Sequence, residues 1–259
     1  MDEGAVRELF DREMRRDALP DMPGATVERV AGVMRQTGPA HGWNGVLWSD
    51  LGPADADRAI ARQIAHFTAL GLGFEWKLYA HDRPGDLGGR LRAAGFRPEP
   101  EEALLVADAA AVAGLATEPP RGVVLRPVTD AAGVRLMADV HEQAFGTDSG
   151  PLARQLTDRL ATDPGTVVAV VALAGGRPVS SARVELPPGK AFAGLWGGGT
   201  VRDWRGRGVY RALVAHRARI AVARGYRHLQ VDASRDSSPI LRRLGFTQLS
   251  TTTPYRYEV

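Results

Sequence analysis

The chain of 259 residues repeats itself, and this repetition limits its fold more than any other feature. A shift of 153 residues aligns the following pairs: Trp196 with Trp43, Gly198 with Gly45, Asp203 with Asp50, Arg211-Ala212 with Arg58-Ala59, and Ala233 with Ala80. A shift of 150 then aligns Leu241-Arg242 with Leu91-Arg92 and Gly245-Phe246 with Gly95-Phe96. Order, spacing and residue type persist over about fifty positions, which chance matching of common residues would rarely give. The sequence therefore predicts two copies of one α/β unit.

Composition narrows the class of protein further. The chain is 44% hydrophobic and 24% charged, as in ordinary globular domains, so it can bury a sizeable core. Cysteine is absent, which excludes disulfides, thiolate zinc sites, iron–sulfur clusters and a cysteine nucleophile. No apolar run is long enough for a membrane span, and the first residues lack the apolar core of a signal peptide. We expect a cytoplasmic protein with no membrane partner.

The charge balance is mildly basic and depends on arginine. The net charge is +3 with a pI near 9.6, and Lys77 and Lys190 are the only lysines. Acidic and basic residues alternate along the chain, so we expect no nucleic-acid partner. The histidines show no two-histidine metal spacing, and we expect no metal site.

A segment rich in small residues, 107–122, ends in a proline pair and separates two stretches with strand and helix patterns. We therefore divide the chain into a first domain at 1–110, a linker at 111–121 and a second domain at 122–259. The elements predicted after the boundary are, in order, strand 123–126, helices 130–145 and 151–160, strands 166–173, 178–186 and 191–201, helix 208–224, strand 227–233, helix 238–244 and a strand region from 246. Their order is βααβββαβαβ.

The first half has similar but weaker patterns. Its predicted elements are helix 3–17, strands 26–36 and 45–49, helix 55–70, strand 74–79 and helix 86–94.

The richest chemistry lies where the strand ending at Val201 meets the helix from Gly208. Gly206 and Gly208 expose backbone N–H groups at the start of a long helix, where unpaired amides and the helix dipole favour an anion. The arginines at 205, 207 and 211 add positive charge. A phosphate-binding loop of the Gly-Lys-Ser/Thr type and a dinucleotide fingerprint are both excluded, because their residues are missing. The pattern indicates a pyrophosphate site; the alternative is an arginine-rich helix start that binds nothing.

The segment Arg205-Gly-Arg-Gly-Val-Tyr210, followed by Leu241-Arg-Arg-Leu-Gly-Phe246, resembles the Gcn5-related N-acetyltransferase (GNAT) superfamily. The family signature is Arg/Gln-x-x-Gly-x-Gly/Ala, and Tyr210 departs from its small final residue. The resemblance implies an α/β (α+β) fold of two GNAT-like units, each with a mixed, mainly antiparallel sheet flanked by helices. It also implies that acetyl-coenzyme A binds the second unit. The implied binding residues are Gly199, Thr200, Val201, Arg205, Gly206, Arg207, Gly208, Val209, Tyr210 and Arg211.

Acyl transfer to an amine needs a base and a proton source for the leaving thiolate. Glu185, near the end of strand 178–186, is the preferred base and Asp232 the second choice; the alternative for Glu185 is a solvated strand end. The resemblance implies a tyrosine as acid, but Leu241 occupies its position. Ser234 and Tyr255 are therefore the candidate acids, and a turn or capping role is the alternative for Ser234.

In the first unit, positions 52–57 read Gly-Pro-Ala-Asp-Ala-Asp where the second has Arg-Gly-Arg-Gly-Val-Tyr. Pro53 removes a backbone N–H, and the carboxylates of Asp55 and Asp57 place negative charge where the ligand anion would bind. We therefore expect a degenerate unit without a coenzyme A site.

The predicted function is direct acetyl transfer, in a ternary complex, from acetyl-CoA to an amine of a small-molecule or peptide acceptor. The alternative is a non-catalytic acyl-CoA-binding or regulatory protein. A monomer and a homodimer both fit the sequence.

Overall fold

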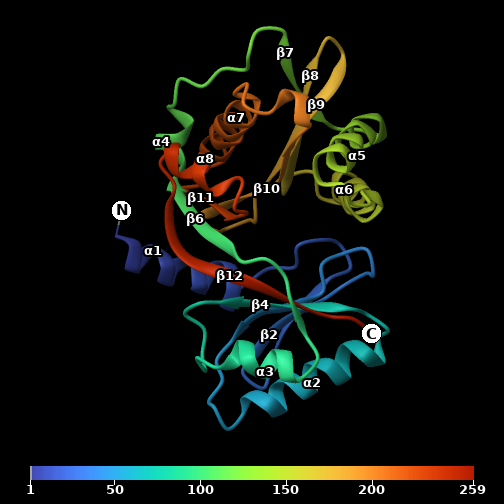
Figure 1. Cartoon of the computed structure of the whole chain (residues 1–259), viewed down its shortest axis with the longest axis vertical. Helices are drawn as coiled ribbons and strands as arrows, with labels where there is room; N and C mark the ends of the chain where they lie inside the picture. Colours follow the sequence, from blue (N-terminus) through green and yellow to red (C-terminus); the bar gives the residue numbers. More distant parts are fainter. Residues whose placement is uncertain (1) are drawn as a thin grey trace. The chain divides into compact units, whose positions relative to one another are not determined.

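The computed structural model describes residues 2–259, and the chain in it forms two compact units (Figure 1). The first contains the chain up to Leu104 together with Asp232–Ser238 and Gln248–Val259. The second contains Leu105–Val231 and Pro239–Thr247. This division differs from the predicted domains at 1–110 and 122–259, because nearly all of the last strand joins the first unit's sheet.

The first unit contains most of the elements predicted for it. The elements observed in it are α1 (Glu3–Phe10), a π-helical turn η1 (Asp11–Arg16), β1 (Thr26–Val30), β2 (Val33–Thr37), β3 (Gly45–Ser49), α2 (Ala56–Ala69), β4 (Phe74–Tyr79), α3 (Leu87–Ala93), β5 (Arg97–Pro98) and β12 (Thr247–Tyr257), of which β5 and β12 were not predicted for this unit. The strand order is β1-β2-β3-β4-β12, with β5 also paired to β12. β3 and β4 are parallel, and the other pairs are antiparallel.

The single strand predicted over 26–36 is wrong. β1 and β2 form an antiparallel hairpin whose turn is Ala31-Gly32, both with positive φ. Gly32 has a φ of +81°, and a Cβ there would lie 2.9 Å from the carbonyl oxygen of Asp50. Gly32 is a single glycine among apolar residues, so the hydrophobic pattern of this segment did not indicate a turn.

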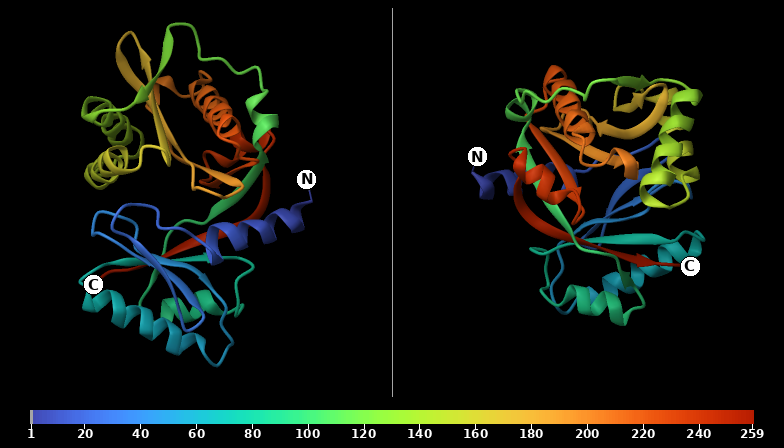
Figure 2. Two further views of the ribbon diagram at one scale, coloured as in Figure 1. Left: turned by 180° about the vertical axis from the view of Figure 1, so that it is seen from behind. Right: turned by 45° about the horizontal axis from the view of Figure 1, so that its top comes forward.

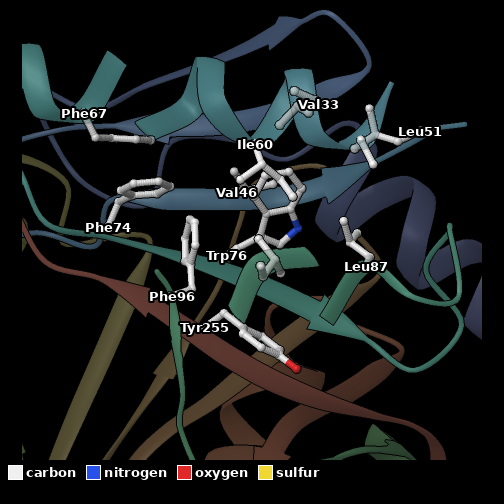
Figure 3. Packing of buried hydrophobic residues seen from close by; sticks show 13 residues of the cluster. Val33, Val46, Leu51, Ile60, Phe67, Phe74, Trp76, Leu87, Phe96 and Tyr255 are labelled. Carbon is white, nitrogen blue, oxygen red and sulfur yellow. The ribbon is translucent and has the colours of Figure 1, made fainter. Parts of the chain in front are cut away.

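The first unit's core lies between its sheet and α2 and α3. Figure 3 shows the packed side chains, with Phe74 and Trp76 of β4 pointing the same way, as alternate residues of a strand do. The rings of Phe67 on α2 and Phe74 stack at a centroid distance of 4.2 Å. Tyr255 of β12 belongs to the same cluster. The C-terminal strand therefore supplies part of this core.

The second unit follows the predicted order βααβββαβαβ, except that most of its last strand lies in the first unit. Its elements are β7 (Val123–Val128), α5 (Ala131–Phe145), α6 (Gly150–Thr162), β8 (Val167–Ala174), β9 (Arg177–Glu185), β10 (Phe192–Thr200), η2 (Arg202–Trp204), α7 (Val209–Ala223), β11 (His228–Ala233) and α8 (Ser238–Arg243). β7 to β10 form an antiparallel meander, and β10 pairs with β11 in parallel.

Helices cover both faces of the second unit's sheet, with α5 and α6 on one face and α7 on the other (Figure 2). Alternate residues of β8 show both contacts: Val167 and Val171 pack in the cluster with α5 and α6, and Val170 packs with Leu213 of α7. A strand buried on both faces is nearly continuously apolar, as β8 is.

The segment predicted as a linker is partly ordered structure. β6 (Glu102–Asp108) runs into α4 (Ala109–Ala113), whose Val112 is buried. Arg219 of α7 donates hydrogen bonds to the carbonyl oxygens of Ala113 and Leu115. Small residues here allow close helix packing, a role that composition alone does not separate from a flexible linker.

The internal repeat is also present in the structure. A shift of 153 places the first residue of α7, Val209, on Ala56, the first residue of α2. In both units a helix crosses over between two parallel strands, β3 and β4 in the first and β10 and β11 in the second. The two copies therefore share topology as well as residue types.

Candidate functional site: the β10–α7 junction

The loop between β10 and α7 is built on glycines in the left-handed region. Gly206 and Gly208 have φ values of +73° and +86°. A Cβ at Gly206 would meet nothing within 4 Å, whereas one at Gly208 would lie 3.4 Å from an Arg211 nitrogen. Side-chain-free residues with this backbone turn successive N–H groups toward one concave surface, as anion-binding loops do.

The arginines of this loop have two roles. Arg205 donates hydrogen bonds to the carbonyl oxygens of Thr200 and Ala144, at 3.1 and 3.0 Å, and so ties the loop to β10 and α5. Arg207 is exposed and lies over the Trp204 ring, 4.9 Å from its centroid. Arg211 is also exposed. Arg205 therefore shapes the loop, and the other two offer positive charge to a ligand.

The helix behind the loop is long enough to contribute a dipole. α7 has 15 residues, begins after Gly208, and has no side chain capping its first amides. Unpaired N–H groups and the positive end of the dipole favour a phosphate group at such a helix start. The glycines, free amides and exposed arginines together fit the pyrophosphate of an acyl-CoA.

The strand leading into the loop has an open edge. β10 pairs with β11 only from Phe192 to Gly194, and the later residues of β10 have no ladder partner on that side among the strand pairings described. On its other side β10 keeps its pairing with β9 at Gly199 and Thr200. Backbone groups along such an edge can pair with the amides of an extended ligand. Pantetheine, the arm of coenzyme A, carries two such amides.

β10 contains a bulge just before this open edge. Trp196 pairs with Arg183 and Gly199 with Ser181, so one extra residue lies between them on β10. Gly197 has a φ of +60°, and a Cβ there would lie 3.0 Å from Nη1 of Arg183. Bulges occur next to active sites, where they redirect backbone groups.

Two residues that the sequence analysis did not assign to catalysis lie against this bulge. A Cβ on Gly198 would lie 2.8 Å from Cε2 of Tyr210 and 3.7 Å from Nη2 of Arg217. Arg217 is only 1% exposed and hydrogen-bonds the Tyr210 side chain. The sequence contained a signal for Arg217. It lies one helical turn after Leu213 on the buried face of α7, where a charged residue is unusual.

Glu185 is held by two arginines. Its Oε1 accepts hydrogen bonds from Arg159 and Arg183, both at 3.0 Å, and its side chain is 20% exposed. Burial would raise the pKa of this carboxyl, but the charges of Arg183 and Arg159 outweigh burial and lower it. Glu185 is therefore an ionised, paired carboxylate and not a solvated strand end.

Replacing Glu185 by glutamine is expected to lower the free energy of unfolding by about 3 kcal/mol at pH 7, because two guanidinium groups lose their partner. A carboxyl with a lowered folded pKa stabilises the fold above its unfolded pKa, near 4.5, and loses this effect as the pH falls through the folded value. The gap between wild type and variant should therefore narrow below about pH 4.5, as measured by urea unfolding at several pH values.

A matched control is Glu118→Gln, which removes an exposed carboxylate paired with Arg219. Its effect should stay below about 0.5 kcal/mol. Equal stability losses in the two variants, or a Glu185→Gln gap that is independent of pH, would contradict the ion-pair role.

Ser234 and Asp232 follow Val231 of β11. Ser234 is exposed, and its Oγ accepts a 3.4 Å hydrogen bond from the Ser237 backbone N–H. This contact matches the turn role that was its alternative. Asp232 forms an ion pair with Lys77 of β4, and its other carboxylate oxygen is buried without a partner in the part of the chain described here. Asp232 is thus a paired residue of the first unit.

Tyr255 lies in the hydrophobic core of the first unit. It is 4% exposed, opposite Trp76 on β4 and Pro98 on β5. Its hydroxyl would be 2.5 Å from a Cβ on Gly88, so the ring fills a space that this glycine leaves open. The contacts described for Tyr255 are those of a packing residue.

The equivalent loop of the first unit has the opposite electrostatics. Asp55 and Asp57 stand at the start of α2, where they pair with Arg58 at 2.6 Å and Arg90 at 2.9 Å. These carboxylates already interact with the helix dipole and with nearby cations. That this helix start holds no phosphate stays a prediction.

Comparisons with known proteins agree with the geometry. Residues 134–246 match the Acetyltransferase (GNAT) family. A GCN5-related N-acetyltransferase from Kribbella flavida superposes with a TM-score of 0.69 at 19% identity, covering 98% of this chain and 93% of that one. A tandem GNAT protein from the clavulanic acid biosynthesis pathway superposes with a TM-score of 0.61 at 14% identity, covering 93% and 84%.

A functionally unknown conserved protein from Staphylococcus epidermidis is also similar, with a TM-score of 0.68, 14% identity, and coverage of 94% and 96%. No curated protein matches the chain. Segment 134–246 is therefore similar to the GNAT family, and nearly the whole chain shares its fold with solved proteins that include a tandem GNAT protein. The match of this segment to the family supports acyl transfer from an acyl-CoA in general terms.

Two features are missing from residues 2–259, the part of the chain that the structure describes. No helix there is long and apolar enough to cross a membrane. No group of three or more metal-ligating side chains gathers there in a geometry that would hold a metal ion.

Proposed function

We propose that the chain is an N-acetyltransferase that moves an acetyl group from acetyl-CoA to an amine of a small-molecule or peptide acceptor. The observation that carries the proposal is the glycine and arginine loop at the start of α7, placed directly after the open edge of β10. The chain passes directly from a free strand edge to a candidate phosphate site. The strand edge suits the pantetheine arm of coenzyme A, and the phosphate site suits its pyrophosphate.

The binding residues we propose are those predicted from the sequence. The backbone of Gly199, Thr200 and Val201 would pair with pantetheine, and the amides of residues 206–211 would hold the pyrophosphate. Arg207 and Arg211 would add charge, while Arg205 holds the loop to β10. The glycine conformations and the open space at Gly206 support this fit.

On the acceptor side, geometry separates the three predicted catalytic residues. Glu185 is ionised, and the two guanidinium groups that hold it lower its pKa, so it is a poor proton acceptor. We propose that it instead holds the side chain of Arg183 in position. Ser234 is exposed but engaged in a local turn, and Tyr255 fills the first unit's core. We propose direct attack by the amine, with its proton released to water.

A screen of thiol release from acetyl-CoA against aminoglycosides, polyamines, amino sugars and peptide N-termini tests the proposal. At least one class should release thiol faster than the enzyme does without acceptor, with an acetylated product of matching mass. Binding of acetyl-CoA without turnover on any class would favour the second candidate, a non-catalytic acyl-CoA-binding protein. The buried Leu241 at the family's tyrosine position favours that candidate.

A further inference from the structure

Arg217 is a buried charge without a carboxylate partner among the described residues. Its Nε donates to the carbonyl oxygen of Leu213 at 3.1 Å, and its Nη1 to that of Arg183 at 3.0 Å. The pKa of Arg217 is lowered to about 10, chiefly by burial; Tyr210 raises it and the nearby Arg183 lowers it, and the value is the balance of these effects. Hydrogen bonds to neutral oxygens do not neutralise the positive charge of Arg217. Buried charges without an ionic partner are costly, and they are found preferentially at functional sites.

The position of this charge is specific. Arg217 contacts the carbonyl oxygen of the very β9 residue at which the β10 bulge begins. Its guanidinium and the Tyr210 ring lie on the α7 side of Gly198, while Arg183 approaches the neighbouring Gly197. The bulge therefore lies within a positively charged environment made by two guanidinium groups.

The hydrogen bond between the two side chains has a defined direction. A guanidinium has no acceptor, so Arg217 donates and the Tyr210 oxygen accepts. The hydroxyl hydrogen of Tyr210 is then directed away from Arg217. A phenol polarised in this way by a buried cation is a stronger donor to a developing anion.

We propose that Tyr210 and Arg217 stabilise the coenzyme A thiolate as it leaves the acyl group at the β10 bulge. The amine nitrogen forms a bond to the acyl carbon, the carbon–sulfur bond breaks, and its electron pair stays on sulfur. Tyr210 donates its hydroxyl hydrogen bond to that sulfur, Arg217 positions the phenol, and the amine proton passes to water. This inference rests on the proposed function, and it assigns a role to the residue that departs from the family signature.

The test measures the pKa of the coenzyme A thiol in the complex, from the ultraviolet absorbance of the thiolate as pH is varied. A complex with a coenzyme A analogue lacking the sulfur supplies the baseline. In wild type the thiol pKa should fall by about one unit or more below that of free coenzyme A, since a charge-assisted hydrogen bond favours the anion. Tyr210→Phe, which keeps the ring against Gly198, should restore most of the free value.

Two further variants complete the experiment. Arg217→Lys keeps a positive charge but loses the planar hydrogen-bonding fork, so it should keep only part of the shift in the thiol pKa. Tyr226→Phe, a tyrosine of the same unit whose hydroxyl donates to the Pro187 carbonyl, should leave the thiol unchanged. With an active acceptor, Tyr210→Phe should lower kcat about 10-fold or more while KM for acetyl-CoA stays within about twofold.

The outcomes separate the two proposals. A wild-type complex with the thiol pKa of free coenzyme A, or a Tyr210→Phe complex that keeps the full shift, would overturn this inference and leave the proposed function standing. Failure of the wild-type protein to bind coenzyme A would overturn both.

Discussion

Replacing Gly208 by glutamate is expected to raise the Kd for coenzyme A by about 100-fold, which corresponds to about 2.7 kcal/mol. Gly208 has a φ of +86° and caps the start of α7. A glutamate there puts a side chain and a negative charge where the pyrophosphate would meet the free amides, and the backbone conformation is strained for any residue with a Cβ. Isothermal titration calorimetry measures the loss directly.

Gly225 provides a matched control for this substitution. It lies just after the C-terminal end of the same helix, with a φ of +85° and open space around its would-be Cβ. Gly225→Glu therefore adds the same charge under nearly the same backbone strain, far along α7 from the loop, and should leave the Kd within about twofold of wild type. A folded Gly208→Glu variant with unchanged affinity would contradict the site.

Replacing Tyr255 by alanine is expected to reduce the free energy of unfolding by about 3 to 5 kcal/mol. The ring is buried in the first unit's core, and its removal leaves a cavity beside residues such as Trp76 on the paired strand β4. Urea denaturation measures the loss.

Tyr255→Phe separates packing from catalysis at this position. Phenylalanine keeps the ring and removes only the hydroxyl, so stability and turnover should both stay near wild type. Loss of a general acid lowers turnover about 10²- to 10⁴-fold. A stable Tyr255→Phe variant with such a loss would assign catalysis to Tyr255 and contradict the packing role.

Local patterns were enough to predict the order of helices and strands in the second unit up to its last strand. Its strands alternate or run continuously apolar between clear turns, and the predicted helix 208–224 differs from α7 by one residue at each end. The glycine and arginine spacing likewise indicated the candidate phosphate site. Both signals depend on residues close together in the sequence, which is why they could be found there.

Features that depend on distant pairing were not predictable in the same way. Nothing local shows that β12 pairs with β4, where Thr252 lies opposite Tyr79, 173 positions earlier, so Tyr255 was expected near the second unit's chemistry. Nor does a strand-end glutamate show that Arg159, from a different element, will pair with it. Strand register and ion pairs of this kind are decided by tertiary packing.

Tyr210 illustrates a signal that was visible but not interpreted. A bulky aromatic residue replaces the small residue of the family signature, and the sequence alone gives no partner for it. The structure supplies one in Arg217, seven residues further along the same face of α7. Two departures from expectation, an aromatic residue in the loop and a charge on a buried stripe, are adjacent in space.

The most direct test of the account is the stoichiometry of acetyl-CoA binding to the intact chain, measured by isothermal titration calorimetry. The second unit offers free amides and exposed arginines at the start of α7, whereas in the first unit Asp55 and Asp57 occupy the equivalent helix start. The account predicts one molecule bound per chain, with the Kd raised about 100-fold in Gly208→Glu. A stoichiometry of zero or two, or one site unaffected by that substitution, would contradict it.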